Sequence, residues 1–255
     1  EKYIWLSDSS FVKQRREIEK FDKASELRDC LKKIRAHIKA NLDSPDLLRR
    51  KMATVWYLID CLKFRVGDEK DEDEADTVGA TTLRPEHVQF MDNGNVVFHF
   101  LGKDSVEWNI EAQLPAKVVA NLREFVGSAS SSVFSGVNSS NAKSFLEEVA
   151  KGFTPKVFRT YHATKAVSDT LSRSKVERDE PLYVKKYEAT MANLEAAKEC
   201  NHKRTLPKNW EQSLARMEER LRILHAKQDL SKTSKQREKK EDRAKELQMR
   251  IQLRK

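Results

Sequence analysis

Residues 156–164 read K-V-F-R-T-Y-H-A-T, and Pro155 stands directly before them. Proline is well tolerated in the first turn of a helix, so this pattern predicts a helix over Thr154–Leu171. Arg159 then lies one turn into that helix, where the positive end of the helix dipole adds to the charge of its side chain. The stretch therefore predicts a helix that presents a guanidinium group to an anion.

Three further basic residues stand in short strings elsewhere in the chain. Arg65 lies in F-R-V-G-D-E-K, Lys103 in F-L-G-K-D-S and His202 in C-N-H-K-R. Each of them, taken singly, is more often a solvated surface residue or a structural histidine than a catalytic group. The pattern gains its meaning from the order Arg, Lys, Arg, His, and we call Arg65, Lys103, Arg159 and His202 the basic quartet.

The quartet has the side chains that metal-free cleavage of a phosphodiester needs. Negative charge on the non-bridging oxygens must be stabilised, a nucleophile must attack in line, and the leaving oxygen needs a proton. Arg65 and Arg159 suit the first task, because a guanidinium is always charged and matches two phosphate oxygens at once. His202 can donate to the same phosphate, and Lys103 can protonate the leaving oxygen if nearby positive charge lowers its pKa.

Hydrophobic periodicity predicts a mainly α-helical chain with one small sheet. Apolar residues spaced by three or four positions indicate amphipathic helices, and Pro, Ser and Gly mark several of their ends. Ser44 is expected to cap the second helix, and Gly67 is expected to stop it after Arg65. The expected helices cover residues 20–40, 44–65, 115–126, 141–151, 154–171 and 181–200.

Residues 87–110 have a different character. Val96–Leu101 is rich in β-prone residues, and the Asp-Asn-Gly turn signal at 92–94 precedes it. Gly102–Ser105 then turns the chain into Val106–Ile110. We expect a three-stranded antiparallel meander with Lys103 at the tip of its second turn, and a surface loop in the Ser/Gly-rich stretch 127–140.

The last part of the chain is basic and has a heptad pattern. Residues 201–255, the basic tail, hold 17 Lys and Arg against 8 Asp and Glu, so they carry the whole net charge of +9. Apolar residues recur there every three or four positions, and a polar stretch at Asp229–Lys235 interrupts them. We expect an antiparallel coiled-coil hairpin. Its positive charge suggests attraction to a polyanion, although charge alone favours the alternative, a solvated charged helix.

Several function classes find no support in the sequence. The 3 cysteines are too few for a disulfide framework, and no Cys/His spacing indicates zinc. The acidic run Asp68–Asp76 lacks the spacing of a calcium loop, so we expect no metal there. There is no P-loop, no transmembrane run and no signal peptide. Because the chain begins Glu1-Lys2 without methionine, we expect it to be part of something longer.

A series of motifs, in order over residues 1–205, resembles the eukaryotic type IB DNA topoisomerases. The resemblance implies the family's α+β, mainly α-helical catalytic core for residues 1–206 and a basic coiled-coil linker for 207–255. The matching strings are K-Y-I at 2–4, R-V-G-D-E-K at 65–70, A-D-T-V-G at 75–79, L-R-P-E-H-V at 83–88, F-L-G-K-D-S at 100–105, K-V-F-R-T-Y at 156–161 and C-N-H-K-R at 200–204.

That resemblance implies a function and its site. The family relaxes supercoiled duplex DNA by transient nicking through a 3′-phosphotyrosine, with neither ATP nor an obligatory metal, so we expect no cofactor and no membrane. Arg65, Lys103, Arg159 and His202 would be catalytic, and Lys103, Asp104, Lys156, Lys203 and Arg204 would contact DNA. Asp104 is similar to a residue that influences the response to camptothecin-type poisons. The implied location is the nucleus, with the mitochondrion or kinetoplast as the alternative.

The family's nucleophile is missing from the pattern. Its tyrosine lies in an S-K-x-N-Y type motif after the linker, and none of the 5 tyrosines here has that context. We expect the nucleophile on a tyrosine-bearing C-terminal domain or on a small subunit, as in the split enzymes of kinetoplastid parasites. Two alternatives stay open: a tyrosine recombinase-like strand transferase, which uses a similar phosphate site, and a non-catalytic DNA-binding module.

Overall fold

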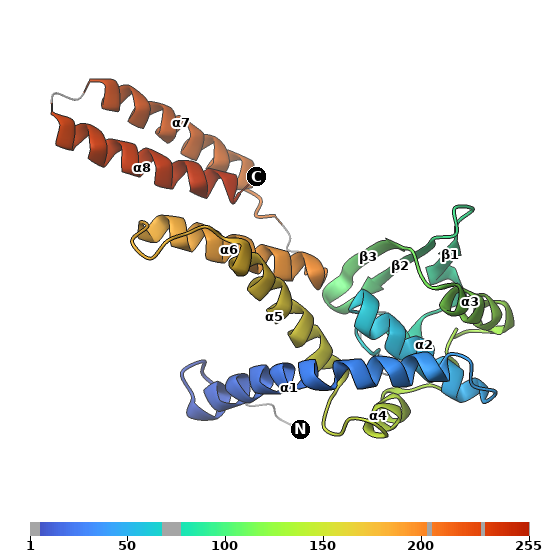
Figure 1. Ribbon diagram of the computed structural model, residues 1–255. Helices are drawn as coiled ribbons and strands as arrows, with labels where there is room; N and C mark the ends of the chain where they lie inside the picture. Colours follow the sequence, from blue (N-terminus) through green and yellow to red (C-terminus); the bar gives the residue numbers. More distant parts are fainter. Residues whose placement is uncertain (1–5, 68–77, 203–205, 231–232, 255) are drawn as a thin grey trace. The chain divides into compact units, whose positions relative to one another are not determined.

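The computed structural model describes residues 6–67, 78–202, 206–230 and 233–254 (Figure 1). Helices dominate it and a single small sheet accompanies them, which confirms the α+β, mainly helical class.

The chain forms two compact units, Glu1–Thr164 and Lys165–Lys255, which divide inside helix α5. The boundary at residue 206 between a catalytic core and a linker remains a prediction from the sequence. The helices are α1 Phe11–Asn41, α2 Leu47–Leu62, α3 Ala116–Ser128, α4 Ser139–Glu147, α5 Pro155–Arg173, α6 Leu182–Glu199, α7 Trp210–Asp229 and α8 Ser234–Gln252.

Helix α1 is longer than its hydrophobic pattern predicts. It begins at Phe11 rather than at residue 20, and pairs such as Arg15–Glu19, 3.0 Å apart, support its first turns. The expected buried face is confirmed for the residues from Ala24 to Ile38. Phe21 belongs to the same apolar pattern but is 50% exposed, and the Nζ of Lys20 lies 4.9 Å from the centroid of its ring.

Helix α2 is the centre of the first unit. It begins at Leu47 with Asp46 as its cap, whose carboxylate accepts a hydrogen bond from the Leu48 N–H at 2.9 Å, so the expected Ser44 cap is wrong. Trp56 is fully buried, and its indole donates to the Ala142 carbonyl of α4 at 2.7 Å. The helix ends at Leu62, because Lys63 adopts a left-handed φ of 59°. The stop expected at Gly67 therefore lies too late in the chain.

The sheet is the expected antiparallel meander. Strands β1 Val88–Phe90, β2 Val96–Gly102 and β3 Val106–Ala112 pair in that order, and Gly102 opposes Val106 across the second turn. Phe64, just after α2, makes edge-on contacts with three aromatic side chains of the sheet, which are Phe98, Phe100 and Trp108. These contacts attach the sheet to the end of α2.

The Ser/Gly-rich stretch between α3 and α4 is a loop, as expected, although part of it is buried. The side chains of Val133, Phe134 and Val137 are buried in the core, and the Val133 N–H donates to the Leu83 carbonyl at 2.8 Å. A description of 127–140 as a surface loop is therefore wrong for these apolar residues. Asn138 then caps α4 by accepting from the Asn141 N–H at 2.9 Å.

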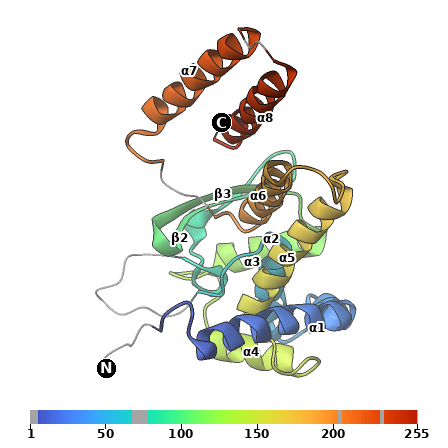
Figure 2. The same cartoon turned by 90° about the vertical axis from the view of Figure 1, so that its left-hand side faces the viewer.

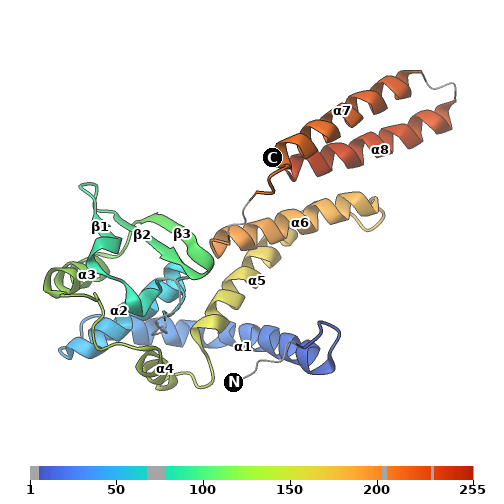
Figure 3. The ribbon, with the colours of Figure 1, turned by 180° about the vertical axis from the view of Figure 1, so that it is seen from behind.

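The second unit contains the expected hairpin. Helices α7 and α8 lie side by side in each view (Figures 2 and 3). They are antiparallel. The Nζ of Lys240 in α8 donates to the Lys227 carbonyl near the end of α7, while Nη1 of Arg254, just after α8, donates to the Ser213 hydroxyl near the start of α7. The buried seam of α8 consists of Ala244, Leu247 and Ile251. None of the helices in the described ranges combines the length and apolar content that a membrane-spanning helix needs.

Candidate functional site

Arg65 lies on the extended segment that follows α2, with its side chain exposed. A second segment, Val78–Thr82, pairs with this backbone. The Ala80 N–H donates to the Arg65 carbonyl at 2.8 Å, and the Thr81 N–H and hydroxyl donate to the Val66 carbonyl at 2.7 and 2.9 Å. Hydrogen bonds from residues 80 and 81 therefore fix the position of the backbone at Arg65 and Val66.

Two glycines allow this close pairing. A Cβ on Gly79 would lie 2.3 Å from the Gly67 nitrogen and 2.8 Å from the Val66 carbonyl carbon, which is impossible without a backbone shift. Gly67 itself has a φ of +85°, a conformation that glycine adopts without steric cost. Only glycine at both positions lets the two segments approach this closely.

The same segment reaches the hairpin that carries Lys103. The Val78 N–H donates to the Leu101 carbonyl at 2.7 Å. Lys103 follows two residues later in a 3₁₀ turn, Lys103–Ser105, between β2 and β3, and its side chain is exposed. The expected position at the tip of the second turn is confirmed. The backbone of Asp104 belongs to this turn, and its side chain lies outside the described part of the structure.

Arg159 approaches Arg65 from another element. It lies on α5, one turn after Pro155 as predicted, and it is only 9% exposed. Its Nη1 donates to the carbonyl of Lys63 at 2.5 Å, two residues before Arg65. Lys156 lies one turn earlier on the same helix and is exposed. The first unit thus brings three members of the quartet to one neighbourhood, through Lys63 and the Val78–Thr82 segment.

The fourth member, His202, belongs to the second unit and follows the end of α6. Its backbone N–H donates to the Ala197 carbonyl at 2.8 Å, and Asn201 before it has a left-handed φ of 49°. Lys203 and Arg204, the next expected DNA contacts, lie outside the described residues.

Left-handed backbone marks the surroundings of the quartet. Over the described ranges, the non-glycine residues with positive φ are Lys63, Ser105 and Asn201. Each is one or two positions from a quartet member. Such a residue costs on the order of 1–3 kcal/mol and persists where the surrounding structure over-determines it, often at functional sites.

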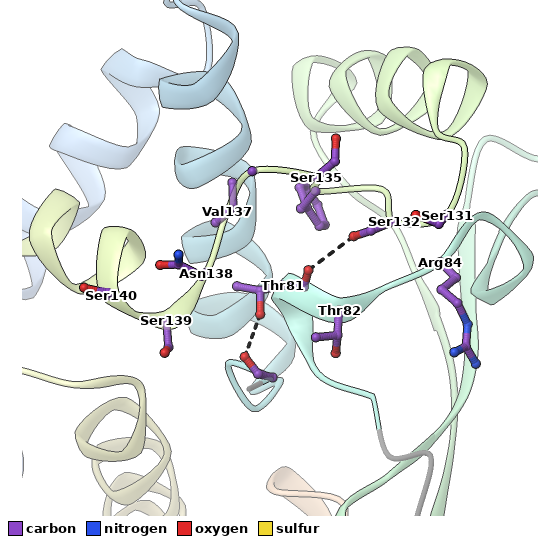
Figure 4. Close-up of a pocket in the computed structure, with 13 residues that line it drawn as sticks. Thr81, Thr82, Arg84, Ser131, Ser132, Ser135, Val137, Asn138, Ser139 and Ser140 are labelled. Carbon is purple, nitrogen blue, oxygen red and sulfur yellow. Dashed lines mark hydrogen bonds between the residues drawn. The ribbon is translucent and has the colours of Figure 1, made fainter. Parts of the chain in front are cut away.

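A pocket of about 700 Å³ with several hydroxyl side chains in its lining opens beside Gly67 (Figure 4). The Thr81 hydroxyl donates to the Gly67 carbonyl at 2.6 Å on one side of it. Asn138, the cap of α4, lies on the other side together with Ser139 and Ser140. Hydroxyl groups and a helix N-terminus suit phosphate oxygens. The hydroxyl-bearing residues of the lining are Thr81, Thr82, Ser131, Ser132, Ser135, Ser139 and Ser140.

Sequence reasoning missed a buried carboxylate next to the quartet. Asp60 of α2 is 7% exposed and accepts hydrogen bonds from Arg35 Nε at 2.6 Å, Arg35 Nη2 at 3.1 Å and His162 Nε2 at 2.9 Å. Burial by itself would raise the pKa of Asp60, but the hydrogen bonds from His162 and Arg35 outweigh it and hold the pKa below the ordinary 3.8. The one available signal was His162, which stands three residues after Arg159.

Two tyrosines lie in the first unit within the described ranges, Tyr57 on α2 and Tyr161 on α5. Tyr57 packs against the core from α2, and burial, together with Cys61, raises its pKa to about 12. Tyr161 is half-buried, and its ring lies edge-on to His162. Within the described ranges no cluster of His, Cys, Asp or Glu could hold a metal ion, and the acidic run Asp68–Asp76 lies outside those ranges.

Comparison with known proteins gives one consistent result. A family model described as the catalytic core of eukaryotic DNA topoisomerase I matches residues 9–240. DNA topoisomerase 1 of Candidozyma auris is 38% identical over 226 residues, which is 88% of this chain and 30% of that protein. DNA topoisomerase 1 of Candida albicans is 38% identical over 224 residues, or 87% of this chain and 28% of that protein. Mitochondrial DNA topoisomerase I of Rattus norvegicus is 34% identical over 228 residues, or 86% of this chain and 38% of that protein. The chain thus spans well under half the length of these relatives.

Proposed function

The chain belongs to the eukaryotic type IB DNA topoisomerase family, and we propose that it supplies the phosphate-activating side of an enzyme that nicks and reseals duplex DNA. The reaction relaxes supercoils through a transient 3′-phosphotyrosine. The observation that carries the proposal is the convergence of Arg65, Lys103 and Arg159 in one unit, where the backbone of Val78–Thr82 and the carbonyl of Lys63 link their elements.

Each member of the quartet has one role in this proposal. Arg65 and Arg159 bind the non-bridging oxygens of the scissile phosphate and stabilise the charge that grows on them. Lys103, exposed on its hairpin tip, enters a groove of the DNA and protonates the 5′ leaving oxygen. His202 donates a further hydrogen bond to the phosphate.

The nucleophilic tyrosine comes from outside these 255 residues in the proposal. It lies on a C-terminal segment or on a second subunit, because Tyr57, Tyr161, Tyr183 and Tyr187 all lie in other contexts, on α2, α5 and α6. Family membership favours this arrangement over the recombinase-like alternative. The enzyme would act in the nucleus, and the name of the rat relative keeps the mitochondrion as the second location.

The surface around the quartet supports a DNA-binding role. The hydroxyl-lined pocket beside Gly67 suits a phosphate backbone, since hydroxyl side chains and backbone N–H groups are common phosphate donors. Asp104, Lys156, Lys203 and Arg204 would add DNA contacts. The basic tail adds long-range attraction to the polyanion.

A plasmid relaxation assay tests the proposal. The purified chain should bind supercoiled plasmid without relaxing it, and adding a tyrosine-bearing C-terminal segment of a family member should restore relaxation. The same mixture made with the Arg159→Ala chain should stay inactive. Relaxation by the chain alone, or equal relaxation with and without Arg159, would show that the assignment of roles is wrong.

A further inference from the structure

Parts of three helices meet at the buried carboxylate of Asp60, within the first unit. Arg35 reaches it from α1, His162 reaches it from α5, and Asp60 itself stands near the end of α2. The pair of bonds from Arg35 is a two-point contact, the geometry that makes Arg–carboxylate pairs directional. Asp60 therefore fixes the relative positions of three elements at one point.

The carboxylate is charged in the folded protein. Burial disfavours its ionised form, and the bonds from His162 and Arg35 more than compensate. An ionised carboxylate only accepts hydrogen bonds, so the His162 Nε2 that faces it carries the hydrogen. Other titratable groups near this cluster, among the residues that the structure describes, include Tyr57 and Cys61 of α2 and Tyr161 of α5. Removal of the Asp60 charge would leave the Arg35 and His162 donors without their ionised acceptor, which would cost folding free energy.

The spacing links this cluster to Arg159. The carboxylate of Asp60 is bonded to His162, and the carbonyl of Lys63 accepts a hydrogen bond from Arg159. Lys63 comes three residues after Asp60, and Arg159 comes three residues before His162. The Asp60–His162 contact and the Lys63–Arg159 contact thus lie about one helical turn apart, both along the end of α2 and along α5. The two segments run past each other in opposite directions. Two such points fix both the translation and the rotation of α5 against the end of α2. If the Asp60–His162 contact were lost, the Arg159 guanidinium at the other contact would gain conformational freedom.

We infer that Asp60, held by Arg35 and His162, is a positioning residue that preorganises the guanidinium of Arg159 for its phosphate. This inference rests on the proposed function for its catalytic consequence. Asp60 touches no substrate. It acts by holding α5 in register, and a misplacement of about 1 Å at a reacting group costs up to about 10²-fold in rate.

The test compares four chains, each combined with the same tyrosine-bearing segment: the parent, Asp60→Asn, His162→Ala and the control Glu148→Gln. Glu148 also receives a two-point contact, from Arg49 at 3.0 and 2.7 Å, and it joins α4 to α2 away from Arg159. We expect single-turnover DNA cleavage to fall about 10- to 100-fold in Asp60→Asn and His162→Ala. The dissociation constant for duplex DNA should change less than about twofold, since many phosphate contacts share the binding. The control should keep the parent cleavage rate.

A second readout does not depend on catalysis. In the chain alone, the guanidinium N–H signals of Arg159, assigned by their loss in Arg159→Lys, should exchange slowly with water. Exchange should become at least about tenfold faster in Asp60→Asn and stay slow in the control and in the charge-keeping Asp60→Glu. Unchanged exchange in Asp60→Asn, or equal cleavage losses in Asp60→Asn and Glu148→Gln, would overturn the inference. No cleavage by the parent mixture would instead count against the proposed function and leave the exchange result to decide the positioning role.

Discussion

Arg159 holds its guanidinium where little water reaches it, and the Lys63 carbonyl fixes one of its five N–H donors. In such a place a charge interacts with a phosphate more strongly than it would in bulk water. A donor that is already oriented also needs no reorganisation as negative charge grows on the oxygens. Its burial therefore distinguishes Arg159 from the exposed lysines of the same surface.

Replacement of Arg159 by alanine should reduce cleavage far more than binding. Loss of one preorganised donor to a charged transition state typically lowers the rate by about 10²–10³-fold. Arg159→Lys should recover only part of the rate, because one ammonium cannot replace the planar two-point geometry. Single-turnover cleavage and duplex binding, measured on the chain with its tyrosine-bearing partner, check this. Lys151→Ala, a change at an exposed site in the loop before α5, serves as the charge control. Equal losses of rate and affinity in Arg159→Ala would make Arg159 a docking residue.

The role of Lys103 can be tested by chemical rescue of cleavage in a Lys103→Ala chain. If its ammonium protonates the 5′ leaving oxygen, a substrate with sulfur at that bridging position needs no proton. The Lys103→Ala chain should then cleave the 5′-phosphorothiolate substrate nearly as fast as the parent, while it stays slow on ordinary DNA. A defect of the same size on both substrates would mean that Lys103 only positions the DNA.

The element that holds the site together is the short Val78–Thr82 segment. It bonds to the backbone of Arg65 and Val66 on one side and to the β2 hairpin on the other. Its approach depends on Gly79, which has no space for a side chain against Gly67. We therefore expect this segment, more than either arginine alone, to set the distance between Arg65 and Lys103.

Gly79→Ala should consequently lower both stability and cleavage. Forcing an extra methyl into a packed contact typically costs about 1–3 kcal/mol in the free energy of unfolding. The matched control is Gly127→Ala, near the end of α3, where an added Cβ meets nothing within 4 Å. That change should be neutral or slightly stabilising, since alanine favours helix over glycine. Denaturant unfolding and single-turnover cleavage provide the measurements, and a Gly79→Ala chain equal to the control in both would refute the structural role of the segment.

The sequence predicted elements well where one pattern dominates and poorly where distant residues decide. The meander follows from β-prone runs and the Asp-Asn-Gly turn, and the hairpin of the tail follows from its heptads. The end of α2 was placed too late, because Gly67 is a strong local signal while the left-handed turn at Lys63 has none. Asp60 and His162 are 102 positions apart, so no local pattern could reveal their contact.

At the scale of the whole molecule, the charge is unevenly distributed. The basic tail carries the net charge of +9, and its last helix, α8, presents exposed cations on the side away from its buried seam. Deletion of α8 would also remove Ala244, Leu247 and Ile251 from the hairpin core. Point substitutions therefore separate the charge from the packing.

Replacement of the exposed Lys235, Arg237 and Lys239 by glutamine should weaken the salt dependence of DNA binding. Each phosphate contact contributes roughly −0.9 to the slope of log K against log salt. We expect the slope to become shallower by about 1 to 3, with little change in the cleavage rate of bound DNA. A chain with Lys235→Arg and Lys239→Arg keeps its charge and should keep its slope. If the glutamine variant also keeps its slope, the hairpin is only a spacer.

The central claim is that this chain activates a phosphate for a tyrosine located elsewhere. The most direct measurement traps the covalent intermediate on a DNA duplex with a labelled scissile strand and identifies the polypeptide that carries the label. With the chain and a tyrosine-bearing segment present as separate polypeptides, the account predicts label on the segment alone and almost none when the chain carries Arg159→Ala. Label on Tyr161, Tyr187 or any other residue of this chain would contradict it.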